Sequence, residues 1–414
     1  MTVDRARRQN LEHLLDLAAT YKGLSRKQLA DKLGRDPTKL MPETGNPKLD
    51  YLVRLAELLD WSIGDVAEVI WRDEPPCECA AAAKDFESLN ALAKEAHGKG
   101  EYARMLTLSE AMLDAATTPE QRAISSLREG GAWDGMGRYM RQLEAVRRGL
   151  QEGPITSDLR NLLQVNLANA YYTLGYLVEA RAMARDLADA FDECAPTSRP
   201  SRAAQAFSHY VMGHASRCLT TQQPERGPYF ARAAKASLQR AVDLYTGLAD
   251  EFNNNSWRGI ANTCVGGMLE PDVELGQISA QDAVAKLLKG LDAVVDIDAQ
   301  PSGDLLESYG WWCIFGCDLS LRHFEGGDLQ RHMAVFTNKG YEIADRLNNW
   351  AMRERLFSME FIQRQRLNEL AGFPVEWTID SEEVKVIVGT LGRFPSFRST
   401  GWKILQTATV VDDK

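Results

Sequence analysis

Apolar side chains recur along almost the whole chain at the spacing of an amphipathic helix. The clearest stretch is 161–180, where Leu167, Tyr171 and Leu174 mark one buried helical face. Gly175 interrupts this pattern, and a new apolar periodicity begins two residues later. The stretch therefore predicts two helices joined by a tight turn.

The same glycine turn occurs three times. Gly100, Gly137 and Gly175 are separated by 37 and 38 residues, and each is flanked by apolar helical patterns. A fixed period of this length predicts a stack of helix pairs, because each pair can bury its apolar face only against its neighbours. We expect three further helix pairs, at 201–219 with 229–252, 255–270 with 280–295, and 304–323 with 328–347.

The two ends of the chain have different patterns. A long polar helix at 348–371 is suited to cap the stack, and the tail 372–414 predicts two short helices that begin at Ser381 and near Ser399. The first 72 residues predict five short helices that belong to a separate domain. The expected domains are therefore 1–72, a linker at 73–84 that contains Pro75 and Pro76, a helical solenoid at 85–371, and the tail. The expected fold class is all-α.

The N-terminal helices carry clear boundary signals. Ser25 and Gln28 form a capping box at the start of the second helix, and Gly34 ends it. Asp36 and Pro37 predict the start of a third helix, over 36–41. The other three helices are expected at 4–21, 49–59 and 62–71.

Charge is distributed unevenly between these regions. The whole chain carries a net charge of −10, but residues 1–72 carry +1 and the remainder −11. Only the N-terminal region is therefore not repelled by a polyanion such as DNA. No apolar run is long enough to span a bilayer, and the N-terminus lacks a signal-peptide core, which predicts a cytoplasmic protein.

The sequence offers no catalytic or cofactor motif. It has no phosphate loop, dinucleotide fingerprint, nucleophile elbow or HExxH motif. Seven scattered cysteines fit reduced thiols, and neither Cys77–Cys79 nor Cys313–Cys317 has a second ligand pair at zinc spacing. We therefore expect no enzyme activity, metal or cofactor.

Residues 4–72 resemble the phage-repressor-like helix-turn-helix domain. Gln28, Ala30 and Gly34 fall at that family's positions, and GNPKLDYLVRLAELLDWSIGDV (45–66) is similar to its fourth and fifth helices. The resemblance implies that the third helix enters the DNA major groove, although Pro42 shortens it. The residues expected to contact DNA are Arg26, Lys27, Gln28, Thr38, Lys39 and Lys48.

The repeats resemble the tetratricopeptide repeat, whose unit is about 34 residues. The matching residues are Asn166, Leu167, Ala168, Asn169, Tyr171, Tyr172, Gly175 and Ala180. The resemblance implies a right-handed solenoid whose first helices line a concave wall. Asparagine amides on that wall can pair with an extended peptide backbone, while Arg128 or Lys94 can hold a carboxylate. The residues expected to bind peptide are Asn90, Lys94, Arg128, Asn166, Asn169, Tyr172, Tyr210, His214 and Arg217.

This combination of domains resembles the peptide-responsive bacterial and phage regulators called the RRNPP group. The resemblance implies a homodimer that binds operator DNA and is modulated by a short peptide or protein ligand in the solenoid. An alternative stays open: a protein-interaction scaffold or inhibitor with a degenerate helix-turn-helix, favoured by Pro42 and the acidic balance.

Overall fold

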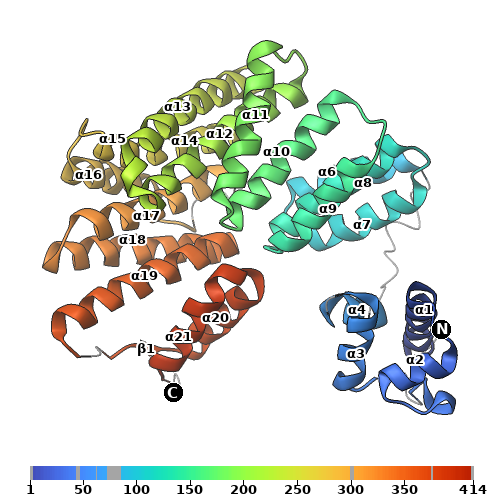
Figure 1. Ribbon diagram of the computed structural model, residues 1–414. Helices are drawn as coiled ribbons and strands as arrows, with labels where there is room; N and C mark the ends of the chain where they lie inside the picture. The colour runs from blue at the N-terminus through green and yellow to red at the C-terminus, as the bar shows by residue number, and fades with distance from the viewer. Residues whose placement is uncertain are drawn as a thin grey trace. The chain divides into compact units, whose positions relative to one another are not determined.

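The computed structural model describes residues 3–42, 47–61, 63–71, 85–298, 303–373 and 376–411. The chain forms two compact units, residues 1–78 and 79–414. The predicted linker 73–84, with Cys77 and Cys79, lies outside the described residues. The chain is all-α, apart from two very short strands, and its larger unit is a solenoid of paired helices (Figure 1).

The smaller unit is a bundle of short helices around an apolar core. Its elements are α1 (Val3–Lys22), α2 (Arg26–Leu33), the 3-10 turn η1 (Pro37–Lys39), α3 (Leu49–Leu59) and α4 (Ile63–Trp71). Leu14, Leu33, Tyr51 and Ile70 are among the side chains buried in its centre. The capping box of Ser25 and Gln28 forms as predicted.

The predicted third helix, 36–41, is wrong in length. It is the single 3-10 turn η1, which Asp36 caps by accepting a hydrogen bond from the Thr38 amide at 2.8 Å. Pro42 accounts for the difference, because the residue before a proline is disfavoured from helical geometry. The Tyr51 hydroxyl donates to the Leu40 carbonyl at 3.0 Å and fixes the turn against α3.

The larger unit begins with three compact helix pairs, each joined at a predicted glycine. Gly100, Gly137 and Gly175 have φ values of +72°, +68° and +86°, which a residue with a side chain rarely adopts. The pairs are α6 (Phe86–Gly98) with α7 (Tyr102–Ala115), α8 (Pro119–Gly135) with α9 (Tyr139–Gln151), and α10 (Ser157–Thr173) with α11 (Leu177–Glu193).

Longer and less regular pairs follow, close to the predicted ranges. They are α12 (Arg199–Gln222), η2 (Pro224–Arg226) and α13 (Gly227–Phe252), then α14 (Asn255–Gly267), α15 (Leu269–Glu274), α16 (Ala280–Leu291) and η3 (Asp292–Val294), then α17 (Asp304–His323) and α18 (Gly326–Arg346), then α19 (Trp350–Ala371). The first helices α6, α8, α10, α12, α14, α17 and α19 pack side by side in succession, and we call them the first-helix layer.

The tail returns to the early part of the solenoid. It contains β1 (Thr378–Ile379), α20 (Ser381–Arg393), η4 (Pro395–Phe397), α21 (Arg398–Thr407) and β2 (Thr409–Val410), and the two strands pair in parallel. Ile387 and Phe397 share one core with Leu143 on α9 and Leu163 on α10. Figure 1 shows α20 and α21 beside α19, on the side where α9 and α10 approach. The tail therefore packs against both the early helices α9 and α10 and the last solenoid helix, α19. The sequence pattern does not predict this contact.

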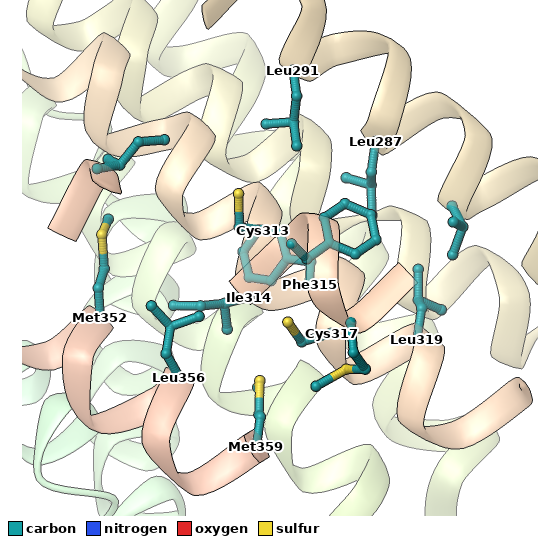
Figure 2. Packing of buried hydrophobic residues seen from close by; sticks show 14 of the residues in the cluster. Leu287, Leu291, Cys313, Ile314, Phe315, Cys317, Leu319, Met352, Leu356 and Met359 are labelled. Atoms are coloured by element: carbon teal, nitrogen blue, oxygen red, sulfur yellow. The ribbon is translucent and has the colours of Figure 1, made fainter. Parts of the chain in front are cut away.

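The largest core lies around α17. Figure 2 shows Cys313, Ile314 and Phe315 of this helix packed among leucines and methionines from α16 and α19. Cys313 and Cys317 are buried here and take part in packing, as predicted. None of the described helices is long and apolar enough to cross a membrane.

Gly316 lets α18 approach α17 closely, and this provides a test of the packing. A methyl group at Gly316 would lie 2.4 Å from the Phe336 ring, whereas one at Gly327 would meet nothing within 4 Å. We predict that Gly316→Ala lowers the free energy of unfolding by about 1–3 kcal/mol through overpacking. Chemical denaturation measures this, and Gly327→Ala is the matched control. Equal stability of the two variants would contradict the packing described for α17.

Candidate functional site

All six predicted DNA-binding side chains are exposed on the smaller unit. Arg26, Lys27 and Gln28 form the first turn of α2, Thr38 and Lys39 lie in η1, and Lys48 directly precedes α3. None of the four cations among them forms an ion pair with another described residue. Their charge is therefore available to phosphates.

The two uncharged members of this set are partly engaged. The Gln28 carbonyl oxygen accepts from the Ser25 backbone amide at 2.9 Å, and the Thr38 hydroxyl donates to Asp36 at 2.5 Å. Sequence reasoning did not identify Arg54 on α3. Its guanidinium lies directly against Gly34, so that a methyl group there would meet Arg54 Nη1 at 2.2 Å. Arg54 thus adds a cation next to the end of α2.

In the larger unit, two of the predicted peptide-binding residues are bonded to each other. Arg128 Nε on α8 donates to Asn90 Oδ1 on α6 at 3.0 Å, and Asn90 is buried. Lys94, one turn further along α6, is exposed. The amide oxygen of Asn90 is therefore already in use, while Lys94 remains available.

Asn166 and Asn169 lie about one turn apart on α10 but differ in their bonding. Asn166 Nδ2 donates to the Leu162 carbonyl at 2.8 Å within its own helix. Asn169 is partly buried, and its side chain makes no hydrogen bond to any other described residue. Its amide can therefore still donate and accept, as pairing with a peptide backbone requires.

Four aromatic side chains from three helices of the first-helix layer meet near the middle of the solenoid. The centroid of the His214 ring on α12 lies 4.4 Å from that of Tyr210 and 6.2 Å from that of Tyr172 on α10. The His214 ring also stacks on Phe315 of α17, with the two centroids 5.7 Å apart. His214 is buried, and neither of its ring nitrogens has a hydrogen-bond partner among the described residues. Burial, and secondarily the charge of Arg217, holds the pKa of His214 well below its usual value, so the ring is neutral.

The predicted residue Arg217 is the centre of a buried ion network. Its Nη1 donates to Glu270 Oε1 at 2.6 Å and to Asp318 Oδ2 at 3.3 Å, and its guanidinium lies over the Phe315 ring at 4.5 Å. Glu270 also accepts from Arg322 at 2.7 Å. Each charge is thus compensated within the fold, and removing one partner of such a network is costly.

Arg355 on α19 is a cation of the first-helix layer that the sequence analysis does not predict as a binding residue. Its side chain is 35% exposed, and Nε lies 3.5 Å from Glu354. Burial raises the pKa of Tyr172 on α10 to about 12, and the charges of Arg217 and Arg355 lower it. The sequence pattern indicates only a polar helix here, because it does not show which helix a charged residue will face.

Three acidic side chains from α8 and α17 form a second group on the first-helix layer. Burial raises the pKa of Asp134 to about 6, and burial, then the charge of Asp304, raises that of Glu307 to about 7. Gly137, in the turn that follows Asp134, lies against Trp350, and the neighbouring Asn349 donates to Glu307 at 3.1 Å, so the end of α8 and Glu307 both lie at the start of α19. The charge of Asp134 also raises the pKa of Glu307. None of the three forms an ion pair with another described residue. Nor do the described residues include a group of His, Cys, Asp and Glu side chains placed to hold a metal ion.

These groups supply amides, aromatic faces and charges, all of which are able to contact a ligand. The predicted residues fall into two sets: Asn90, Lys94 and Arg128 on α6 and α8, and Tyr172, Tyr210, His214 and Arg217 on α10 and α12. Helix α17 contacts the second set through Phe315, which stacks on His214, and the charge of its Asp304 raises the pKa of His97 on α6 against the effect of burial. The site predictions themselves remain predictions.

No family model matches the chain, and no curated protein matches its sequence. Among solved structures, the chain is similar to the crystal structure of Bacillus thuringiensis PlcR in complex with the peptide PapR7 and DNA, with 15% identity and a TM-score of 0.37. The match covers 70% of this chain and 96% of the other.

The raised pKa of Glu307 predicts a pH dependence of stability. Its pKa is about 7 in the folded chain against a usual 4.5. The folded chain therefore holds this proton more tightly than the unfolded chain does, which adds to the free energy of unfolding below pH 4.5. This contribution is lost as the pH rises through 7. We expect the melting temperature at pH 8 to rise by about 1–3 °C in Glu307→Gln, with a smaller change at pH 5. Thermal unfolding at both pH values measures this. Asp186→Asn, at a side chain 74% exposed, is the control. A lower melting temperature for Glu307→Gln at pH 8 would show that the carboxylate is compensated after all.

Proposed function

We propose that the protein is a DNA-binding transcriptional regulator whose solenoid binds a peptide or protein ligand that modulates operator binding. The observation that carries the proposal is the set of exposed cations on α2, η1 and the start of α3, which form no ion pair with another described residue and lie in the one region of the chain that is not acidic. Exposed Lys and Arg next to a capped helix N-terminus suit phosphate contacts.

The ligand side of the proposal is supported by the first-helix layer. Asn169 on α10 has an amide that makes no hydrogen bond to any other described residue. Arg355 on α19 adds a partly exposed cation whose charge lowers the pKa of Tyr172, which lies on α10 as well. An amide recognises a peptide backbone of any sequence, and a guanidinium recognises a carboxylate. A ligand that prefers one curvature of the solenoid would shift the population of DNA-competent protein.

We further propose that the active form is a homodimer. A single η1 turn is a small recognition element, and two of them, about 34 Å apart on one face of DNA, would supply the affinity that one lacks. A twofold-symmetric operator follows from such a dimer.

The shortness of η1 also favours a second candidate function. A recognition helix reduced to Pro37–Lys39 presents few side chains to a base edge. The second candidate is therefore a protein-interaction scaffold or inhibitor whose helix-turn-helix no longer binds DNA. In that case the solenoid binds a partner protein while the smaller unit binds no DNA.

The DNA contacts can be tested by substitution. We predict that Lys39→Ala and Arg26→Ala each weaken binding to genomic DNA fragments, and that each lowers the slope of log K against log salt by about 1, because one phosphate contact is lost. Mobility-shift titrations at several salt concentrations measure both. Lys99→Ala, at an exposed lysine of the larger unit, should change neither. Unchanged affinity in both variants would favour the scaffold.

The ligand contact can be tested at α10. We predict that Asn169→Ala removes the change in DNA binding that a cell-derived peptide fraction produces, while it leaves DNA binding without that fraction unaltered. The amide supplies both a donor and an acceptor that alanine lacks. Asn338→Ala, at an exposed asparagine on α18, is the control. A full response in Asn169→Ala would exclude this residue from the ligand site.

A further inference from the structure

Asp134 of α8, and Asp304 and Glu307 of α17, form an acidic group that no cation among the described residues compensates. Glu270, by contrast, is bonded to two arginines. Asp134, Asp304 and Glu307 have no such partner among the described residues. Carboxylates removed from water without a counter-charge cost stability, so a chain that keeps three of them together invites an external cation.

The bonding of Glu307 leaves one oxygen unused. Trp311 Nε1 and Asn349 Nδ2 both donate to Oε1, each at 3.1 Å, and no described residue donates to Oε2. The two donors hold the carboxylate in place from α17 and from the N-cap of α19. Glu307 therefore presents a fixed, free acceptor.

A second unused acceptor lies beside Asp134. Gln142 on α9 is only 2% exposed, and its side chain lowers the pKa of the Asp134 carboxylate against the effect of burial. Its Oε1 has no hydrogen-bond partner. A buried amide oxygen without a donor is costly, and its position next to an uncompensated carboxylate indicates that a donor with several N–H groups is missing.

Aromatic rings surround these acceptors. The Tyr102 ring lies against Gly135, next to Asp134, and Tyr139 begins α9 one turn before Gln142. Burial is the main cause that raises the pKa of Tyr102 and of Tyr139, and the charges of Asp134 and Glu307 raise both further. Carboxylates with aromatic faces and an amide oxygen suit an organic cation, such as a guanidinium, better than a small metal ion.

We propose that Asp134, Glu307 and the Gln142 carbonyl form a subsite for a guanidinium or ammonium group of the solenoid's ligand. This inference rests on the proposed function for the identity of the ligand as a peptide, and it adds that the peptide carries an arginine, a lysine or a free N-terminal amine. Asp304, at the first position of α17, extends the negative field toward the His97 side of the layer.

The subsite can be tested without knowing the ligand. The probes are argininamide and citrullinamide, which have nearly the same shape but differ in side-chain charge. We expect the full-length protein to bind argininamide at least about tenfold more tightly, a difference of about 1.4 kcal/mol. The Asp134→Asn/Glu307→Gln double variant should lose this preference. Both replacements keep a side-chain oxygen that accepts the present hydrogen bonds, and each single variant should lose at least about threefold.

A matched control separates local from general charge effects. Asp186→Asn removes one exposed carboxylate from α11 and should retain the full preference for argininamide. A wild-type protein without preference, or a double variant that keeps it, overturns the subsite.

A second measurement distinguishes this inference from the proposed function. Short random peptides that carry one arginine or one citrulline are retained on the immobilised full-length protein and quantified by mass spectrometry. Retention with an arginine preference that the double variant loses supports both ideas. Retention of both libraries without preference overturns the subsite but leaves peptide binding intact. If neither library is retained but argininamide is preferred, the subsite stands and the peptide part of the proposed function fails.

Discussion

Helix α17 is the element on which the arrangement of the larger unit depends, because it must pack closely on one side and present polar groups on another. Gly316 and Gly310 allow Phe336 and Met352 to approach to distances that a side chain would forbid. This fixes the helix against α18 and α19. The same helix then carries Glu307, which accepts from Asn349 at the start of α19, and places Phe315 against His214 of α12. The groups that we propose to contact the ligand are therefore held by the rigid core itself, rather than by a loop.

The charges of the first-helix layer are of two kinds. Around Arg217, each buried charge has an opposite charge within hydrogen-bond distance, and only Nε of Arg217 has no hydrogen-bond partner among the described residues. Around Glu307 and Asp134, the carboxylates are held by neutral donors alone. Only the second arrangement would gain from binding a cation, and this difference gives a physical reason to place a ligand contact at α8 rather than at the more conspicuous buried arginine.

Much of the fold can be predicted from the sequence because its signals are local. The turns at Gly100, Gly137 and Gly175 need a positive φ, and the capping box of Ser25 and Gln28 spans one helical turn. The candidate site is less accessible to such reasoning. His214 and Arg217 are expected on the ligand side, but their partners are distant, and Asp318 lies 101 residues from Arg217. The return of Ile387 and Phe397 to α9 and α10 leaves no trace in periodicity either, because an apolar face does not encode which surface it will cover.

The central claim is that occupancy of the solenoid changes how the smaller unit binds DNA. The most direct measurement is a mobility-shift titration of genomic DNA fragments with the full-length protein, with and without a peptide fraction from the cells that produce it. The account predicts salt-dependent binding whose affinity changes at least about fivefold when the fraction is added, a coupling of about 1 kcal/mol. Binding that is absent under all salt conditions, or that the fraction leaves unchanged, would contradict it.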